Sequence, residues 1–210
     1  SKKTEVKLMC DSGLLIIISA PSGTGKSTLC KKLIDDLPNA CYSVSVTTRN
    51  PRRGEVEGKD YFFVSRNEFK EKIKRRELAE WALVHGHYYG TPKDFLERNL
   101  VKGKDIILDI DVRGAMKLKK RYPQAVFIFL APPSFCELKR RIKGRRRNND
   151  ATIEKRLSNA RWEIGQIGSY DYVVINDRLI DAFRELKCIV TAEKNRVNRI
   201  KEKIQKLNLL

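Results

Sequence analysis

Residues 14–28 read Leu14-Leu15-Ile16-Ile17-Ile18-Ser19-Ala20-Pro21-Ser22-Gly23-Thr24-Gly25-Lys26-Ser27-Thr28. The apolar run at the start is too short to cross a membrane and is rich in β-branched isoleucine, which predicts a strand buried on both faces of a parallel sheet. A glycine-rich turn follows, and after it Leu29, Leu33, Ile34 and Leu37 recur at helical spacing. Strand, turn and helix therefore come in the order that a phosphate-binding loop requires.

The turn has the chemistry of an anion-binding loop. Gly23 and Gly25 let the backbone wrap closely with its N–H groups pointing inward, and the helix N-terminus adds the positive end of its dipole. We expect Lys26 to reach the β- and γ-phosphate oxygens of a nucleotide and the Ser27 hydroxyl to ligate Mg²⁺. Ala20 replaces the first glycine of the strict motif, a mild departure. The predicted loop consists of Ala20, Pro21, Ser22, Gly23, Thr24, Gly25, Lys26, Ser27 and Thr28.

Length and composition limit the number of domains and the cellular setting of the protein. A chain of 210 residues suits one globular domain with its own core and room for a small insertion. Its five cysteines include no Cys-x-x-Cys pair, which indicates neither a disulfide framework nor a zinc site and favours a reducing, cytoplasmic setting. No signal peptide or membrane span is expected, and residues 1–12 are predicted to form a loose polar leader.

The chain is strongly basic, with 44 Lys and Arg against 26 Asp and Glu and a formal net charge of +18. Such an excess suits nucleic acid, an anionic surface or a small polyanionic substrate. Because the basic residues crowd within helical patterns rather than in one tail, most of them are interpreted as solvated helix faces.

The middle of the chain does not alternate simply between strands and helices. A strand over 42–46 precedes a polar loop over 47–60, a strand over 61–64 and a helix that a Ser65–Glu68 capping box opens. Residues 78–89 are typical of two short strands turned at Gly86. Strands so close together, with no crossover helix between them, do not fit a parallel sheet, so an inserted mixed β subdomain is predicted.

The alternation of strands and helices returns after Pro92. Strands are expected over 105–111, 125–130 and 172–175. Three helices are expected to begin at Pro92, at Ser134 and at about Ile180, and two others to end at Arg121 and at about Gly168. The last helix carries an apolar stripe, Val190, Val197, Ile200, Ile204 and Leu207, which we expect to pack on the parent domain. The fold class is therefore α/β, with a P-loop NTPase-type parallel sheet and flanking helices.

Two aspartates, Asp109 and Asp111, close the strand over 105–111, at the end of the sheet where α/β proteins bind ligands. An aspartate there commonly steadies Mg²⁺ beside the serine or threonine of a phosphate loop. A spacing of two residues puts both on one side of a regular strand, although the strand could end before Asp111. We expect a site role for at least one of them.

The predicted subdomain concentrates groups that bind anions, namely Ser45, Arg49, Arg52, Tyr61, Tyr89 and Thr91. Arginine forks bind phosphate bidentately, and tyrosine hydroxyls can satisfy the remaining oxygens. Glu80 stands out, because a carboxylate beside a phosphate weakens binding unless it has another task. Guanine presents its N1–H and N2 amine side by side to a carboxylate, a pair of donors that adenine lacks.

Six separated blocks together resemble guanylate kinase, in that family's order and over about residues 13–195. They are residues 20–28, 45–52, 54–61, 80–82, 88–91 and 107–111. The resemblance implies ATP + GMP ⇌ ADP + GDP with Mg²⁺ as cofactor. It also implies a core over about 13–42, 93–140 and 157–210, a GMP-binding subdomain over about 43–92 and a small helical lid over about 141–156.

On the acceptor side, the resemblance implies a GMP phosphate site formed by Arg49, Arg52, Tyr61 and Tyr89. Ser45, Glu80 and Thr91 would then address guanine or its surroundings. Asp111 would lie near GMP and Asp109 near the metal with Ser27, although the assignment between the two aspartates stays open.

On the donor side, the resemblance implies that Lys26 and the lid arginines Arg141, Arg145 and Arg156 are catalytic. Their task would be to neutralise charge on the transferred phosphoryl group. Asn176 would approach the adenine of ATP. Arg146 stands where the family usually has glycine, which puts the lid hinge in question.

Three alternatives compete with this function. A peptide-binding scaffold would typically lack a working phosphate loop, whereas Lys26 and Ser27 are present. A nucleic-acid-binding P-loop protein would exploit the net charge, and a kinase of similar fold acting on a sugar phosphate would leave Glu80 unpaired. The expected partners are ATP and GMP, without membrane or nucleic acid, and the chain is expected to be a monomer or homodimer.

Overall fold

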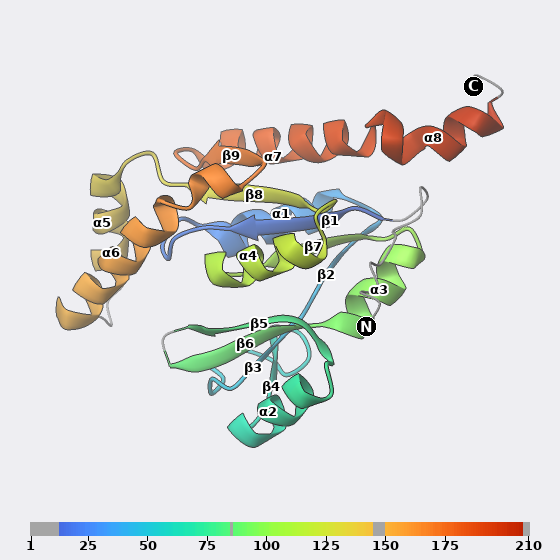
Figure 1. Cartoon of the computed structure of the whole chain (residues 1–210). Coiled ribbons are helices and arrows are strands. Elements are labelled where there is room, and N and C mark those ends of the chain that lie inside the picture. The colour runs from blue at the N-terminus through green and yellow to red at the C-terminus, as the bar shows by residue number, and fades with distance from the viewer. Residues whose placement is uncertain (1–12, 85, 145–149, 208–210) are drawn as a thin grey trace.

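The structure is a computed structural model that describes residues 13–84, 86–144 and 150–207. A five-stranded sheet in the order β2-β7-β1-β8-β9 forms its main body (Figure 1). All its strand pairs are parallel, which confirms the predicted α/β class. The strands are β1 (Leu15–Ser19), β2 (Ala40–Tyr42), β7 (Asp105–Asp109), β8 (Val126–Ala131) and β9 (Tyr172–Ile175).

Strand β1 lies at the centre of this sheet and joins two layers of core. Ile16 and Ile18 pack in one cluster with residues of α1 and α7, whereas Leu15 and Ile17 pack in the other with residues of α3 and α4. Alternate side chains of a strand point to opposite faces, so a run buried on both sides must be apolar at every position. The helices are α1 (Lys26–Asp36), α3 (Lys93–Val101), α4 (Val112–Arg121) and α7 (Leu179–Lys194).

A separate four-stranded mixed sheet, in the order β4-β3-β6-β5, carries the inserted part of the chain (Figure 1). Its strands are β3 (Ser45–Thr47), β4 (Tyr61–Phe63), β5 (Leu78–Val84) and β6 (His87–Pro92), and α2 (Arg66–Lys74) packs on it. The predicted hairpin is confirmed, because β5 and β6 pair antiparallel on either side of Gly86, whose φ is +86°. The Ser65–Glu68 capping box is also present.

The single strand predicted over 42–46 is wrong. Strand β2 ends at Tyr42 in the parallel sheet, and β3 begins at Ser45 in the mixed sheet. Alternation of apolar and polar residues runs without a break from Tyr42, the end of β2, to Thr47, the end of β3, so this pattern cannot reveal that the chain changes sheets at Ser43 and Val44.

The strand predicted to include Asp111 ends at Asp109. Asp111 is the N-cap of α4, where its Oδ1 accepts hydrogen bonds from the N–H groups of Arg113 at 2.8 Å and Gly114 at 3.2 Å. Such a cap satisfies helix donors that have no partner within the helix. The argument that both aspartates share one side of a strand therefore does not apply.

The helix predicted from Ser134 is confirmed, with Ser134 as its N-cap, but the later C-terminal helices differ in part from the prediction. The helices of this part of the chain are α5 (Phe135–Lys143), α6 (Asp150–Ile164), the 3₁₀ turn η1 (Ile167–Ser169) and α8 (Val197–Lys206). The final helix is interrupted at Asn195, whose side-chain amide donates to the Thr191 carbonyl at 2.8 Å and so competes with the helical backbone. Val190 is buried as predicted, but Val197 and Leu207 are 68% and 59% exposed. No described helix is long and apolar enough to span a bilayer.

Candidate active site

The loop between β1 and α1 forms one wall of a cavity of about 330 Å³ that all nine residues of the predicted phosphate loop line. Gly23 and Gly25 have φ values of +97° and +89°, a region that residues with a Cβ rarely occupy. The hydroxyl of the buried Thr24 donates to the Pro21 carbonyl at 2.7 Å and holds the turn. Backbone conformation at these glycines therefore accounts for their presence in the motif.

Lys26 and Asp109 meet at the floor of this cavity. Lys26 Nζ lies 2.7 Å from Asp109 Oδ1 and donates to the Ile110 carbonyl, also at 2.7 Å. Burial alone would lower the pKa of Lys26, but the charge and hydrogen bond of Asp109 raise this pKa above its ordinary value. Lys26 is therefore a cation at neutral pH and can neutralise phosphate oxygens.

Ser27 and Asp109 offer a donor set that suits Mg²⁺. Ser27 Oγ donates to Asp109 Oδ2 at 2.9 Å, so a hydroxyl and a carboxylate oxygen lie side by side. Mg²⁺ usually takes one or two protein oxygens and completes its shell with water and substrate phosphates. In the described ranges, no group of three or more His, Cys, Asp and Glu gathers into a cage that could hold a metal, so a metal here would need phosphate ligands as well.

A second cavity, of about 560 Å³, brings together the four residues predicted to hold the acceptor phosphate. Arg49, Arg52, Tyr61 and Tyr89 all line it. It shares Ser27, Tyr61, Tyr89 and Asp109 with the first cavity. An anion held by the arginines would therefore lie beside the end of the phosphate loop.

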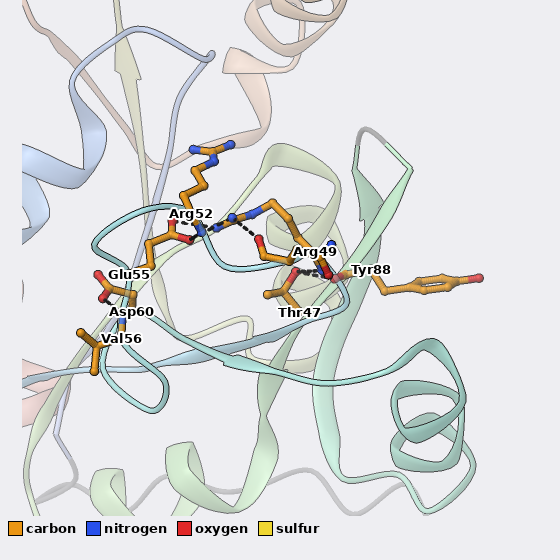
Figure 2. Close-up of polar contacts among 8 residues, drawn as sticks. Thr47, Arg49, Arg52, Glu55, Val56, Asp60 and Tyr88 are labelled. Atoms are coloured by element: carbon orange, nitrogen blue, oxygen red, sulfur yellow. Dashed lines mark hydrogen bonds and ion pairs between the residues drawn. The ribbon is translucent and has the colours of Figure 1, made fainter. Parts of the chain in front are cut away.

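Glu55 is a site residue that the sequence did not single out. Its carboxylate accepts two hydrogen bonds from the Arg49 guanidinium, at 2.8 and 2.9 Å, and one from the Arg52 backbone N–H at 2.6 Å (Figure 2). The hydrogen bond from Arg49 lowers the pKa of Glu55, and the same bond raises the pKa of Arg49. The guanidinium also lies over the Tyr61 ring, 5.2 Å from its centroid. The sequence signal that could have indicated a role for Glu55 is its position as an acidic residue in a basic loop.

Glu80 is buried in the first cavity, 6% exposed. Removal from water raises the pKa of Glu80 to about 7, although its Oε1 accepts a hydrogen bond from Thr91 Oγ1 at 2.7 Å. Gly114 in the first turn of α4 makes room for the other oxygen, because a Cβ there would lie 2.7 Å from Glu80 Oε2. Ser45 and Asp111 line the same cavity, so the structure brings the predicted guanine-binding residues together.

Asn176 connects the end of β9 to the phosphate loop. Its side-chain amide donates to the Thr24 carbonyl at 2.6 Å, and its own carbonyl accepts from Arg141 at 3.1 Å. A Cβ at Gly25 would lie 2.8 Å from the Asn176 amide nitrogen. Asn176 therefore supports the loop itself, a role that the sequence did not suggest.

The predicted lid arginines are placed differently from one another. Arg141 on α5 donates to Glu137 at 2.7 Å and to the Asn176 carbonyl, which keeps it beside the phosphate loop. Arg156 is half-buried on α6 and lines neither cavity. Arg145 and the unusual Arg146 lie outside the described residues.

Fold and cavities together define an α/β protein of the P-loop class, with a phosphate loop on a parallel sheet and a second cavity that Arg49 and Arg52 of the inserted part line. Its residues 12–193 match the family model for guanylate kinase. The chain therefore belongs to the guanylate kinase family, and it is an enzyme, a nucleotide-binding kinase.

Individual relatives agree with this assignment. A guanylate kinase of Caldanaerobacter subterraneus subsp. tengcongensis is 50% identical over 190 residues, which cover 90% of this chain and 92% of that protein. One of Geobacter metallireducens is 50% identical over 192 residues, covering 91% and 95%. The crystal structure of guanylate kinase from Anaplasma phagocytophilum superposes with a TM-score of 0.78 at 35% identity, covering 95% of this chain and 97% of that one.

Proposed function

We propose that this enzyme transfers the γ-phosphoryl group of ATP to GMP, giving ADP and GDP. The observation that carries the proposal is the buried Glu80 carboxylate in the cavity that leads to the phosphate loop. Guanine N1–H and the N2 amine would satisfy Glu80, whereas a sugar phosphate would leave the carboxylate with Thr91 as its hydrogen-bond donor and without the guanine donors, at a cost of about 1–3 kcal/mol. Relatives named guanylate kinase at 50% identity support the same acceptor.

Each substrate has its own set of side chains. Lys26 and the loop N–H groups would hold the phosphates of ATP, and Arg49, Arg52, Tyr61 and Tyr89 would hold the phosphate of GMP. Asn176, which supports the loop, would also approach the adenine. Ser27 and Asp109 would hold Mg²⁺, which when bound neutralises charge on the phosphates.

Direct in-line transfer suits this site. The acceptor is a phosphate oxygen that is already anionic near neutral pH, so no general base is required. Rate acceleration then comes from positioning and from charge neutralisation by Lys26. Arg141, Arg145 and Arg156 would add positive charge from the lid.

Production of ADP with ATP, Mg²⁺ and each of GMP, AMP, CMP and UMP tests the proposal. Of the four acceptors, we expect only GMP to be turned over. This activity should be lost when EDTA removes the metal and restored by excess Mg²⁺. Equal turnover of AMP would contradict guanine recognition by Glu80. GMP binding without any turnover would instead indicate a non-catalytic binding protein.

Glu55→Ala is expected to raise the KM for GMP about tenfold with little change in kcat, because Arg49 loses the two hydrogen bonds that orient it toward the acceptor phosphate. Steady-state kinetics at varied GMP would measure both constants. Glu71→Ala removes an exposed glutamate of the same subdomain and serves as the matched control. An unchanged KM in Glu55→Ala would mean that Arg49 needs no such support.

A further inference from the structure

Glu163 on α6 lies where two cavities meet, and the roles given above do not include it. It lines the cavity of about 330 Å³ together with Lys26 and Glu80. It also lines a neighbouring cavity of about 210 Å³, which Arg113 and Asn159 complete. Its carboxylate is therefore part of the wall that faces the substrates.

The described part of the chain supplies this carboxylate with no hydrogen-bond donor. Within the described ranges the Glu163 side chain makes no hydrogen bond or ion pair. Burial raises the pKa of Glu163 to about 7, with Lys26 and Arg113 opposing this shift and Asp111 adding to it. A half-buried acceptor without a donor is costly, and a carboxylate repels phosphate. The ligand group that fits it is a neutral hydrogen-bond donor.

The contacts of the other wall residues narrow the choice of donor. In the proposed function Glu80 takes the donors of guanine, and the arginines and Lys26 take phosphates. The ribose of GMP must lie between its base and its phosphate, and its hydroxyls are the remaining donors. Val84 and Asp111 line both cavities with Glu163, but Val84 is apolar and Asp111 Oδ1 already caps α4.

We propose that Glu163 contacts the acceptor nucleotide and accepts a hydrogen bond from a ribose hydroxyl of GMP. The inference rests on the proposed function, since it takes GMP as the acceptor.

The position of Glu163 on α6 gives this contact a further effect. Glu163 follows Arg156 by seven residues, about two helical turns, so both side chains leave the helix on the same face. One helix would then present a carboxylate to the sugar and an arginine toward the phosphoryl group. Binding of the correct sugar would help to set the position of the helix that carries Arg156.

Kinetics with GMP, 2′-deoxy-GMP and 3′-deoxy-GMP test the contact. Glu163→Ala is expected to lower kcat/KM for GMP about tenfold and to leave unchanged the value for the analogue that lacks the contacted hydroxyl. Glu163→Gln keeps an acceptor oxygen and the side-chain shape, so its loss with GMP should be smaller. Glu154→Gln changes an exposed glutamate of the same helix and should leave all three values unchanged.

Two results would overturn the inference. Equal losses with GMP and both deoxy analogues would show that Glu163 acts through the loop or helix rather than through the sugar. No loss with GMP in either variant, with an unchanged melting temperature, would show that Glu163 touches nothing in the transition state. Failure of the proposed function is distinct, because the unchanged enzyme would then not phosphorylate GMP at all.

Discussion

Lys26→Met is expected to lower kcat/KM for the phosphorylation of GMP about a thousandfold or more. Lys26 is the one cationic side chain that lines the phosphate-loop cavity in the described part of the chain. In the proposed transfer its positive charge would lie where negative charge spreads over the transferred group, and charge stabilisation of this kind is usually the largest single contribution to catalysis. Steady-state production of ADP would measure the loss.

The matched control for this variant is Lys32→Met, which removes an exposed lysine of the same helix whose ammonium lies over the Phe183 ring. Its activity should be unchanged. Because Lys26→Met also breaks the ion pair with Asp109, its melting temperature should be measured alongside. A folded Lys26→Met enzyme that lost less than tenfold would refute a direct role of Lys26 with the phosphates.

Glu80→Gln is expected to lower kcat/KM for GMP about a hundredfold. Glutamine presents one acceptor and one donor where guanine needs two acceptors, so one guanine N–H would face an amide N–H and lose its hydrogen bond. The preference for GMP over AMP should fall, because the glutamine amide can donate a hydrogen bond to adenine N1, which the carboxylate cannot. A loss of less than threefold with GMP would exclude Glu80 from base recognition.

The same variant should unfold at a higher temperature than the unchanged, ligand-free enzyme at pH 8. The folded pKa of Glu80, about 7, lies above its ordinary value of 4.5, so the fold favours the protonated form. The corresponding stability is fully present below pH 4.5 and is lost as the pH rises through 7, about 3 kcal/mol in all. Glutamine does not titrate, so Glu80→Gln should lose less stability than the parent between pH 5 and pH 8. Identical pH profiles would contradict this.

Local patterns predicted the parts of the fold that depend on neighbouring residues. Strand β1, the phosphate loop and the hairpin at Gly86 each follow from a few adjacent side chains and from glycines at the turns. Both predicted ends of the strand at 172–175 are correct. A short apolar run between polar residues is too short for a buried helix and therefore favours a strand. Side-chain chemistry predicts that four residues lie around one anion, because four anion-binding groups occur in one subdomain. They are Arg49, Arg52, Tyr61 and Tyr89.

Features that depend on distant contacts were not predictable in this way. Gly114 matters only because Glu80, from another sheet, fills the space above it. Glu163 gains its importance from Lys26 and Asp111, which lie far from it in sequence and close in space. Asp111 looked like a strand residue because a helix cap and a strand end share the same amino acids.

Lys26 and Asp109 neutralise each other through their ion pair. A phosphate that takes Lys26 leaves Asp109 with uncompensated negative charge, and a divalent cation that takes Asp109 leaves Lys26 free. In the proposed function each ligand would thereby remove the competitor of the other, so nucleotide and metal would raise each other's affinity by the same factor. The loop would then bind either ligand weakly when it is alone and both strongly when they are present together.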